Sequence, residues 1–338
     1  MKSPVILRLA MVLPALVVFV NTAQQTGQPT PVKSSDQATS PKVFANVIIQ
    51  APASGLPIRQ LTKDDFRLFD DRHEVPITSF SAGERFQTRP VILWLVVLCN
   101  EGGKIGGSRE FSGKEALFRP ALDDLDKRDT VGVAHWCDNG DAQLDLLPTK
   151  DRDAVIGSLT KTLQPISFNL GANSNNLGED AVEKLVRLIL EQGHQMNPDA
   201  LPAIVFLYGD YGSHRKQNLD YVLDNIAEIS GIVFGIKDQD TSMETRVGTG
   251  SQARFVHYLA DQTGGQYFSV APKGYAAALG MILMQLHFRY ELTFVPGKAD
   301  GSRHEMKVEL TKESLAKYKG AQVRYCSEYF PVAEPQWR

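Results

Sequence analysis

The sequence predicts an α/β protein: a doubly wound, mostly parallel sheet with helices on both faces, flanked by a small β-rich unit formed from the N- and C-terminal segments. Val91–Leu98 is an unbroken apolar run between Pro90 and a polar, glycine-containing segment, which is typical of a strand buried on both faces. After this run, apolar strand-like segments alternate with amphipathic helical ones, as a parallel sheet requires. Towards both ends of the chain the hydrophobic period returns to two residues.

Composition places the chain among ordinary globular proteins. It has 338 residues, of which 43% are hydrophobic and 22% charged, so a proper core is expected and wholesale disorder is excluded. The formal net charge is −3, and it becomes more negative without Lys2 and Arg8. This balance favours neither nucleic acid nor an anionic membrane as a partner.

The first 23 residues have the order of an export signal. Lys2 and Arg8 precede an apolar run over 9–20, and small and polar residues follow at 21–23. The run is short for a membrane span and is interrupted by Pro14. We therefore expect cleavage and export to a periplasmic or extracellular location, with an uncleaved membrane anchor as the alternative. No cysteine follows the run, so a lipoprotein anchor is not supported.

The segment 24–42 is rich in Gln, Thr, Ser and Pro and is predicted to be a flexible linker. A β-rich segment over 43–86 follows, with a strand at Val43–Ile49. Alternating apolar residues on either side of a polar turn at Asp70–His73 predict a β-hairpin with one buried face.

An α/β domain is predicted over 88–288 and a closing β-rich segment over 289–338. The expected strands of the α/β domain are Val91–Leu98, Val131–Trp136, Gln143–Leu147, Ala203–Tyr208, Gly231–Ile236 and Gln266–Val270. The expected helices are Ser112–Lys127, Asp151–Leu163, Leu177–Gln192, Leu219–Ile229, Ala253–Gln262 and Tyr275–Leu286. In the first helix Leu117 and Leu122, and in the third Leu185 and Leu188, are expected on the buried face. The closing strands are Tyr290–Val295, Met306–Leu310 and Val323–Tyr325, and we expect the two β-rich ends to pair with each other.

Several segments, taken in order, resemble a known family. They are LTKDDFRLFDD at 61–71, the apolar strand at 91–98, DTVGV at 129–133, LPTKD at 147–151, YELTFVP at 290–296 and VRYCSEYF at 323–330. Together they resemble the von Willebrand factor type A (vWA) domain, in the branch of VWFA-related proteins common in Acidobacteria. The resemblance covers nearly all of the chain after the signal and implies the fold described above.

The resemblance also exposes a departure at the metal site of such domains. That site uses an Asp-x-Ser-x-Ser loop, a Thr and an Asp to surround a divalent cation with oxygens. Here the first loop reads Cys99-Asn100-Glu101-Gly102-Gly103, Ser174 or Asn175 stands where Thr is expected, and the aspartate of the third loop, Asp210, is shifted by one place. We therefore expect a degenerate site that binds no cofactor, with a poor Mg²⁺ site made by Glu101, Ser174 and Asp210 as the alternative.

Two cysteines end neighbouring strands in this interpretation. A vWA-like sheet would bring Cys99 and Cys137 together at the rim where the metal would lie, at a spacing compatible with a disulfide. In an oxidising compartment a bridge is one expectation, and two free thiols are the other. Cys326 would then be unpaired, either buried or open to an intermolecular bond.

No catalytic constellation is evident in the sequence. His135 lies inside an apolar strand and is expected to be a hydrogen-bonded core residue, and the other histidines lack zinc-ligand spacing. The leading hypothesis is an exported, non-enzymatic binding module that engages a protein or cell-surface ligand through the rim. A cation-dependent adhesion domain and a hydrolase are the alternatives. The rim residues expected to contact a partner are Asn100, Glu101, Phe111, Phe168, Asn175, Tyr208, Asp210 and Tyr211.

Overall fold

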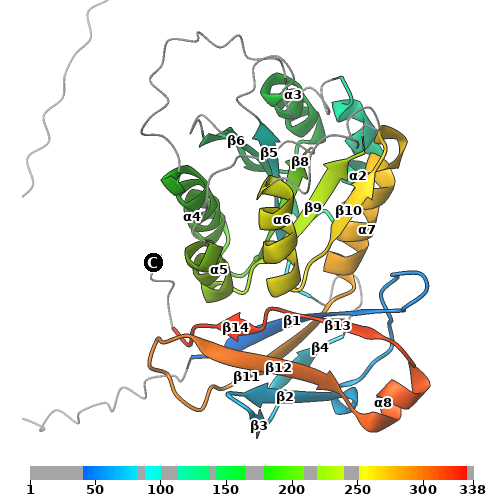
Figure 1. Ribbon diagram of the computed structural model, residues 1–338, viewed down its shortest axis with the longest axis vertical. Coiled ribbons are helices and arrows are strands. Elements are labelled where there is room, and N and C mark those ends of the chain that lie inside the picture. The colour runs from blue at the N-terminus through cyan, green and yellow to red at the C-terminus, as the bar shows by residue number, and fades with distance from the viewer. Residues whose placement is uncertain are drawn as a thin grey trace, which may run out of the picture. The chain divides into compact units, whose positions relative to one another are not determined.

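The computed structural model describes residues 41–82, 88–99, 113–137, 142–163, 179–208, 219–239 and 251–332 (Figure 1). The predicted signal over 1–23 and nearly all of the predicted linker over 24–42 lie outside these residues. Among the helices within them, none is both long enough and apolar enough to cross a bilayer.

The centre of the α/β domain is a six-stranded sheet. Its strands are β5 (Val91–Cys99), β6 (Thr130–Cys137), β7 (Ala142–Thr149), β8 (Leu201–Tyr208), β9 (Ile232–Asp238) and β10 (Tyr267–Val270). They lie in the order β10-β9-β8-β5-β6-β7, and only the edge strand β7 runs antiparallel to its neighbour. The mostly parallel sheet with helices on both faces confirms the predicted doubly wound α/β fold class.

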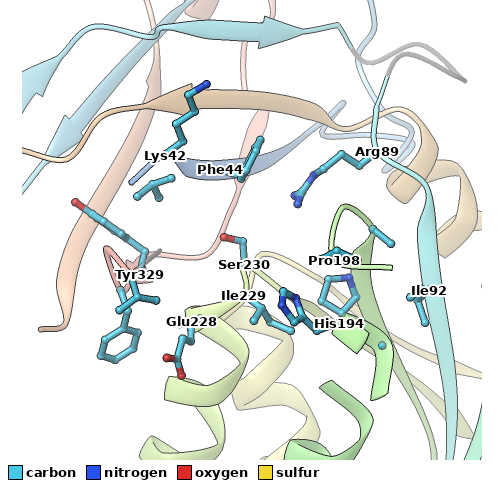
Figure 2. Close-up of a pocket in the computed structure, with 17 residues that line it drawn as sticks. Lys42, Phe44, Arg89, Ile92, His194, Pro198, Glu228, Ile229, Ser230 and Tyr329 are labelled. Atoms are coloured by element: carbon cyan, nitrogen blue, oxygen red, sulfur yellow. The ribbon is translucent and has the colours of Figure 1, made fainter. Parts of the chain in front are cut away.

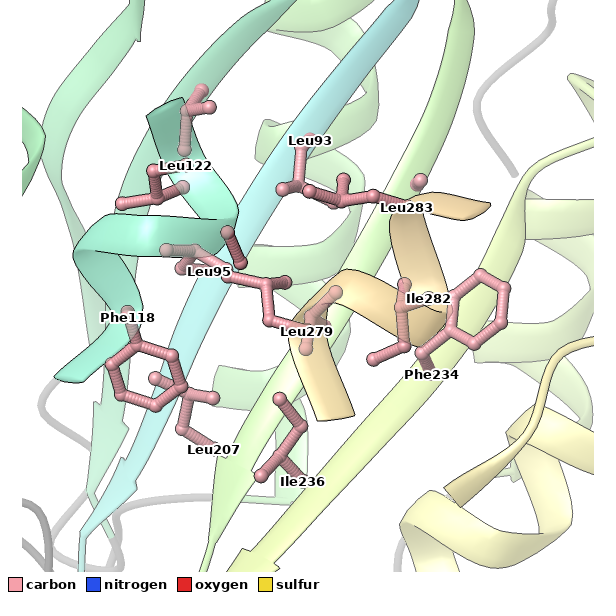
Figure 3. Close-up of a cluster of buried hydrophobic side chains, with 14 of the residues drawn as sticks. Leu93, Leu95, Phe118, Leu122, Leu207, Phe234, Ile236, Leu279, Ile282 and Leu283 are labelled. Atoms are coloured by element: carbon pink, nitrogen blue, oxygen red, sulfur yellow. The ribbon is translucent and has the colours of Figure 1, made fainter. Parts of the chain in front are cut away.

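Helices cover both faces of this sheet because its central strands are apolar on both sides. The helices are α2 (Arg119–Asp123), α3 (Arg152–Thr162), α4 (Glu179–Met196), α5 (Leu219–Glu228), α6 (Ser251–Gln262) and α7 (Tyr275–His287). On one face, Leu93 and Leu95 of β5 pack against residues of α2 and α7, among them Leu122 and Leu279 (Figure 3). On the other face, Trp94 and its neighbours pack against α4, α5 and α6. A strand enclosed in this way has no solvent-facing side, which explains its continuous apolar sequence.

Two helix predictions require correction. In place of a helix over Ser112–Lys127 the described residues form a short 3-10 turn, η2 (Glu115–Phe118), and the short helix α2. Leu117 is 40% exposed and Phe118 is buried instead, because the 3-10 turn rotates the side chains relative to an α-helical path. In α4, Leu188 is 37% exposed, and the buried face follows Val182, Leu185, Val186, Ile189 and Leu190.

The two ends of the chain pair with each other, as predicted. One sheet has the order β13-β1-β11-β4, and the other has the order β14-β12-β2-β3. Their strands are β1 (Val43–Gln50), β2 (Phe66–Asp70), β3 (His73–Val75), β4 (Ser79–Ser81), β11 (Tyr290–Phe294), β12 (His304–Leu310), β13 (Gln322–Arg324) and β14 (Glu328–Tyr329). Side chains from both sheets, including Val47, Leu68, Leu292 and Val308, form one core. Strand β14 and the short helix α8 (Lys312–Lys317) were not predicted from the sequence.

A buried charge cluster joins this β-sandwich to the α/β domain. The Arg289 side chain is fully buried, and its Nη2 lies 2.7 Å from Oε1 of Glu291 and 2.9 Å from the carbonyl oxygen of Arg89. The Nε of Arg89 donates to the same carboxylate at 3.0 Å, and Asn46 Oδ1 accepts from both guanidinium groups. Burial lowers the pKa of Arg289 to about 10, with the charge of Glu291 opposing the shift, so Arg289 remains charged at neutral pH. The Glu291 carboxylate therefore accepts hydrogen bonds from both arginines.

Candidate functional site

The order of the strands defines a topological switch point. Counted along the chain from β5, the six strands lie in the order 3-2-1-4-5-6 when read from β7 to β10, so β5 and β8 are the neighbours at which the connections reverse direction. In open α/β sheets, ligands bind beyond the carboxyl ends of the strands at such a point. Here those ends are Cys99 and Tyr208.

Two of the segments that carry predicted rim residues directly follow strands that end at this edge, and the third connects α3 to α4. Residues 100–112 follow β5, residues 209–218 follow β8, and residues 164–178 precede α4. The predicted residues Asn100, Glu101, Phe111, Phe168, Ser174, Asn175, Asp210 and Tyr211 all lie outside the described residues. Their roles at the rim, and the state of the metal site, stay predictions.

Tyr208 is the one predicted rim residue within the described ranges, and the prediction that it contacts a partner is wrong. It is fully buried, and its hydroxyl oxygen lies 2.9 Å from Nε2 of His257 on α6. His257 in turn stacks on Tyr267 of β10 at 3.5 Å between ring centroids. Burial lowers the pKa of His257, with Lys237 adding to this effect and Asp261 opposing it. Tyr208 is therefore a core residue at this edge of the sheet. A side chain at the end of a strand that has helices on both faces still packs under the neighbouring helix, here α6.

An acidic residue that sequence reasoning missed ends β9 at the same edge. Asp238 is 1% exposed, and its Oδ2 lies 3.1 Å from Nζ of Lys114, which stands immediately before η2. Within the described part of the chain, its other carboxylate oxygen, Oδ1, has no hydrogen bond. The signal available in the sequence was an acidic residue two positions after the apolar strand Gly231–Ile236. At this edge the ion pair with Lys114 ties the start of η2 to the end of β9.

The backbone register brings Cys99 and Cys137 opposite each other. They are paired positions on the neighbouring parallel strands β5 and β6, as the resemblance implied, while their side chains lie outside the described residues. The third cysteine, Cys326, is free and buried, and burial raises the pKa of its thiol to about 12. It is therefore a poor nucleophile and is closed to intermolecular pairing.

We predict a disulfide between Cys99 and Cys137 in protein exported to an oxidising compartment. Paired positions on adjacent strands lie about 5 Å apart and project to the same side of the sheet, within the span of a disulfide. Mass spectrometry of the non-reduced protein after proteolysis should find the two peptides linked, and Cys326 should alkylate only after unfolding. Free alkylation of Cys99 and Cys137 in the native protein would contradict the prediction.

His135 and its neighbours confirm the prediction of a hydrogen-bonded core histidine. His135 is 5% exposed, and its Nδ1 lies 2.9 Å from a carboxylate oxygen of Asp145 on the adjacent strand β7. The pairing satisfies a polar ring inside an apolar strand, which removes the need to assign it a ligand role.

A second polar cluster lies in the β-sandwich. Ligand atoms of Asp70, Asp71 and His304 lie within 4.8 Å of one another, which would permit a metal ion. The carboxylate of Asp70, however, already accepts hydrogen bonds from Tyr329 Oη at 2.6 Å and from the Gly297 amide at 2.8 Å. His304 lies between carboxylates, with Nδ1 2.9 Å from Asp71 in an ion-pair contact and Nε2 3.1 Å from Asp300. When protonated, the His304 ring offsets part of the negative charge of these carboxylates, and the contacts join two turns of the sandwich.

This cluster predicts a pH-dependent contribution of His304 to stability. Burial disfavours its charged form, but the hydrogen bond with Asp300 and the charges of Asp71, Asp300 and Asp70 outweigh burial, so the pKa of His304 is raised above 6.5. A raised pKa in the folded state stabilises the protein fully below about pH 6.5, and this contribution is lost as pH rises through the folded-state pKa. Denaturant unfolding of wild type and His304→Gln should show the larger difference at pH 6 and a smaller one at pH 9. A difference that is constant across this range would contradict the assignment.

No family model matches the sequence, and no curated protein matches it. Among solved structures, a von Willebrand factor type A protein from Catenulispora acidiphila is similar over 78% of this chain and 75% of its own, with 12% identity and a TM-score of 0.40. An aerotolerance-related membrane protein from Bacteroides fragilis matches 57% of this chain and 98% of its own, with 14% identity and a TM-score of 0.38. The protein BatB from Bacteroides thetaiotaomicron matches 58% and 97%, with 14% identity and a TM-score of 0.36. The fold class itself rests on the strand order and register of this chain.

The described side chains at the carboxyl edge are engaged with one another. Asp238 is engaged with a lysine and Tyr208 with a histidine. Among the described side chains of this edge, no serine or threonine hydroxyl is hydrogen-bonded to a histidine that would activate it.

Proposed function

We propose that this protein is an exported, non-enzymatic binding module of the vWA-like type, related to the acidobacterial VWFA-related branch. It engages a protein or a cell-surface ligand through the loops at the carboxyl edge of its parallel sheet. The observation that carries the proposal is the topological switch point between β5 and β8, from which the segments with Asn100, Glu101, Asp210 and Tyr211 leave the sheet. The order of residues 1–23 supports export, and the loops' aromatic residues support protein contacts.

The proposed partner site is tested by capture with matched variants. Protein lacking residues 1–23 is immobilised and exposed to the envelope fraction of the cells that make it, and captured proteins are identified and then purified for affinity measurement. The double variant Phe111→Ser, Tyr211→Ser should bind the purified partner at least ten-fold more weakly, because aromatic residues carry a large share of the binding energy at interfaces. Leu315→Ser is the control, since Leu315 is 44% exposed on α8 of the β-sandwich. Equal binding by the double variant and wild type would place the partner site elsewhere.

We also propose that binding needs no metal ion. The loop after β5 lacks the carboxylate and the two hydroxyls of the vWA motif, so most of the negative charge that would attract a cation is missing. Thermal melts with millimolar Mg²⁺ or Mn²⁺ and with EDTA should coincide. A cation-dependent rise in Tm that disappears in Asp210→Ala would favour the metal-dependent adhesion domain instead.

A further inference from the structure

A cavity of about 160 Å³ lies at the edge of the sheet opposite the carboxyl ends, between the α/β domain and the β-sandwich (Figure 2). Ile92 and Pro202 contribute from the beginnings of β5 and β8, Phe44 from β1, and Ser230 from the turn after α5. No part of the function proposed above uses this cavity. Since hydrophobic cores are otherwise close-packed, a cavity with polar groups at a module junction is a candidate ligand site.

The guanidinium group of Arg89 is fixed in position by its neighbours but leaves one nitrogen without a hydrogen-bond partner among the described residues. Its Nε donates to Glu291 at 3.0 Å, its Nη2 donates to Asn46 at 3.3 Å, and its guanidinium lies 4.3 Å from the Phe44 ring centroid. Within the described part of the chain, Nη1 has no hydrogen-bond partner, and the side chain is 17% exposed. Figure 2 shows the guanidinium directed towards the space between Phe44, Ser230 and Pro198.

Ser230 supplies a second donor from the opposite wall. Its backbone has a φ of 55°, a left-handed conformation that glycine would adopt more readily. The conformation is fixed because the Ser230 amide donates to Ala227 at 3.1 Å and its carbonyl accepts from Asn46 Nδ2 at 3.0 Å. Its hydroxyl points into the cavity in Figure 2 and makes no hydrogen bond with any described residue.

The charge around the cavity favours an anion. Glu291 is shared by Arg89 and Arg289, so one carboxylate faces two guanidinium groups. Lys42 lines the exposed side of the cavity, but Figure 2 shows its ammonium directed away from Ser230. Glu228 lines the cavity as well, but Figure 2 shows its carboxylate directed away from the space between Ser230 and Lys42.

We propose that this cavity binds a small monocarboxylate with an apolar chain. Arg89 Nη1 and the Ser230 hydroxyl are two donors for one carboxylate group, and a hydrogen bond to an ionised acceptor is the stronger kind. Apolar side chains, including Phe44, Ile92, Pro198 and Ile229, form about half of the lining, and they accommodate an alkyl chain of a few carbons. The volume favours a free acid or the carboxylate at the end of a chain over a larger ligand.

The test is isothermal titration of the protein lacking residues 1–23 with four probes. Hexanoate should bind with a millimolar or tighter Kd, whereas hexanamide and inorganic phosphate should bind at least ten-fold more weakly. N-acetyl-leucine distinguishes the two sources of the carboxylate: binding tighter than hexanoate assigns a peptide end, and weaker binding assigns a free acid. Equal binding of hexanoate and hexanamide, stronger binding of phosphate, or no binding of hexanoate would overturn the proposal.

Two variants locate the site. Ser230→Gly retains the left-handed backbone and removes only the hydroxyl, so it should weaken hexanoate binding about ten-fold while leaving the melting transition cooperative. Arg89→Lys removes Nη1 and should weaken binding similarly, with Arg67→Lys on the surface of β2 as its control. If Arg89→Lys fails to fold, Ser230→Gly alone decides the matter, and unchanged hexanoate affinity in that variant refutes the assignment.

Discussion

Replacement of Glu291 with alanine is expected to destabilise the protein by about 3–5 kcal/mol, the range for removing one partner of a buried ion pair. Glu291 is 5% exposed, and its carboxylate accepts from Arg289, from the Arg89 side chain and from the Arg89 backbone amide. Its loss leaves two guanidinium groups at a buried junction with no carboxylate hydrogen-bonded to them. Because Arg289 cannot reach solvent, desolvation of its charge would go uncompensated.

Guanidinium chloride unfolding at pH 7 measures this change. Glu291→Gln keeps the volume of the side chain and one hydrogen-bond acceptor but removes the charge. The stability lost in Glu291→Gln therefore reports the loss of charge, and the additional stability lost in Glu291→Ala reports the loss of packing and of the acceptor. Glu74→Ala is the matched control, because Glu74 is 53% exposed in its pair with Arg67 and its replacement should change stability little. Losses of the same small size for Glu291→Ala and Glu74→Ala would show that the buried cluster does not stabilise the fold.

The buried charge of Glu291 also predicts that the folded state loses stability at acidic pH. Burial raises its pKa, but Arg289 and Arg89 outweigh burial and lower the pKa below 4.5 overall. A lowered pKa in the folded state stabilises the protein above about pH 4.5, and this contribution is lost as pH falls through the folded-state pKa.

Gly265→Ala is expected to be the most damaging glycine substitution, with a loss of about 3 kcal/mol or more. A Cβ built at Gly265 would lie 1.8 Å from the backbone oxygen of Val233, a core residue of β9. A carbonyl held in a sheet cannot move as a flexible side chain can. The turn that leads from α6 into β10 therefore has to shift, and with it the edge of the parallel sheet.

Gly280→Ala is the control and is expected to change stability in the opposite direction. Gly280 lies within α7, and a Cβ there would meet no atom within 4 Å. Alanine in a helix interior is favoured over glycine by about 0.5–1 kcal/mol, so this variant should unfold at higher denaturant. The pair is measured by the same unfolding experiment. A tolerated alanine at 265 would mean that the approach of this turn to β9 is looser than described.

Much of the fold could be predicted because the relevant information is local. The apolar run Val91–Leu98 requires burial on both faces, and the period-two segments near both ends require one buried face each. The helix faces were predicted less well. Leu117 and Leu188 are exposed where burial was expected, since a short 3-10 turn or a one-residue rotation of the buried face depends on the neighbours against which a helix packs.

Some features of the candidate site could likewise be predicted from the sequence, whereas others depend on residues far apart in the chain. The edge that carries the rim loops followed from the positions of the strands, and the resemblance to the vWA domain implied that Cys99 and Cys137 occupy facing positions on neighbouring strands. Tyr208 was assigned to the partner surface because it ends a strand, and only the placement of α6 and His257 over it shows that it is a core residue. Asp238 and Lys114 are 124 positions apart, and no local pattern pairs them.

The sequence by itself determined the α/β middle, the β-rich ends and the edge at which function is expected. These depend on the hydrophobic period and on the succession of strands and helices along the chain, and both are local properties. Only the tertiary structure decided which charges are buried and which polar groups share a cavity. Arg89 and Glu291 are 202 residues apart, and Asn46 and Ser230 are 184 apart. Burial raises the energetic importance of such contacts, because a charge or donor removed from water must find its partner within the fold.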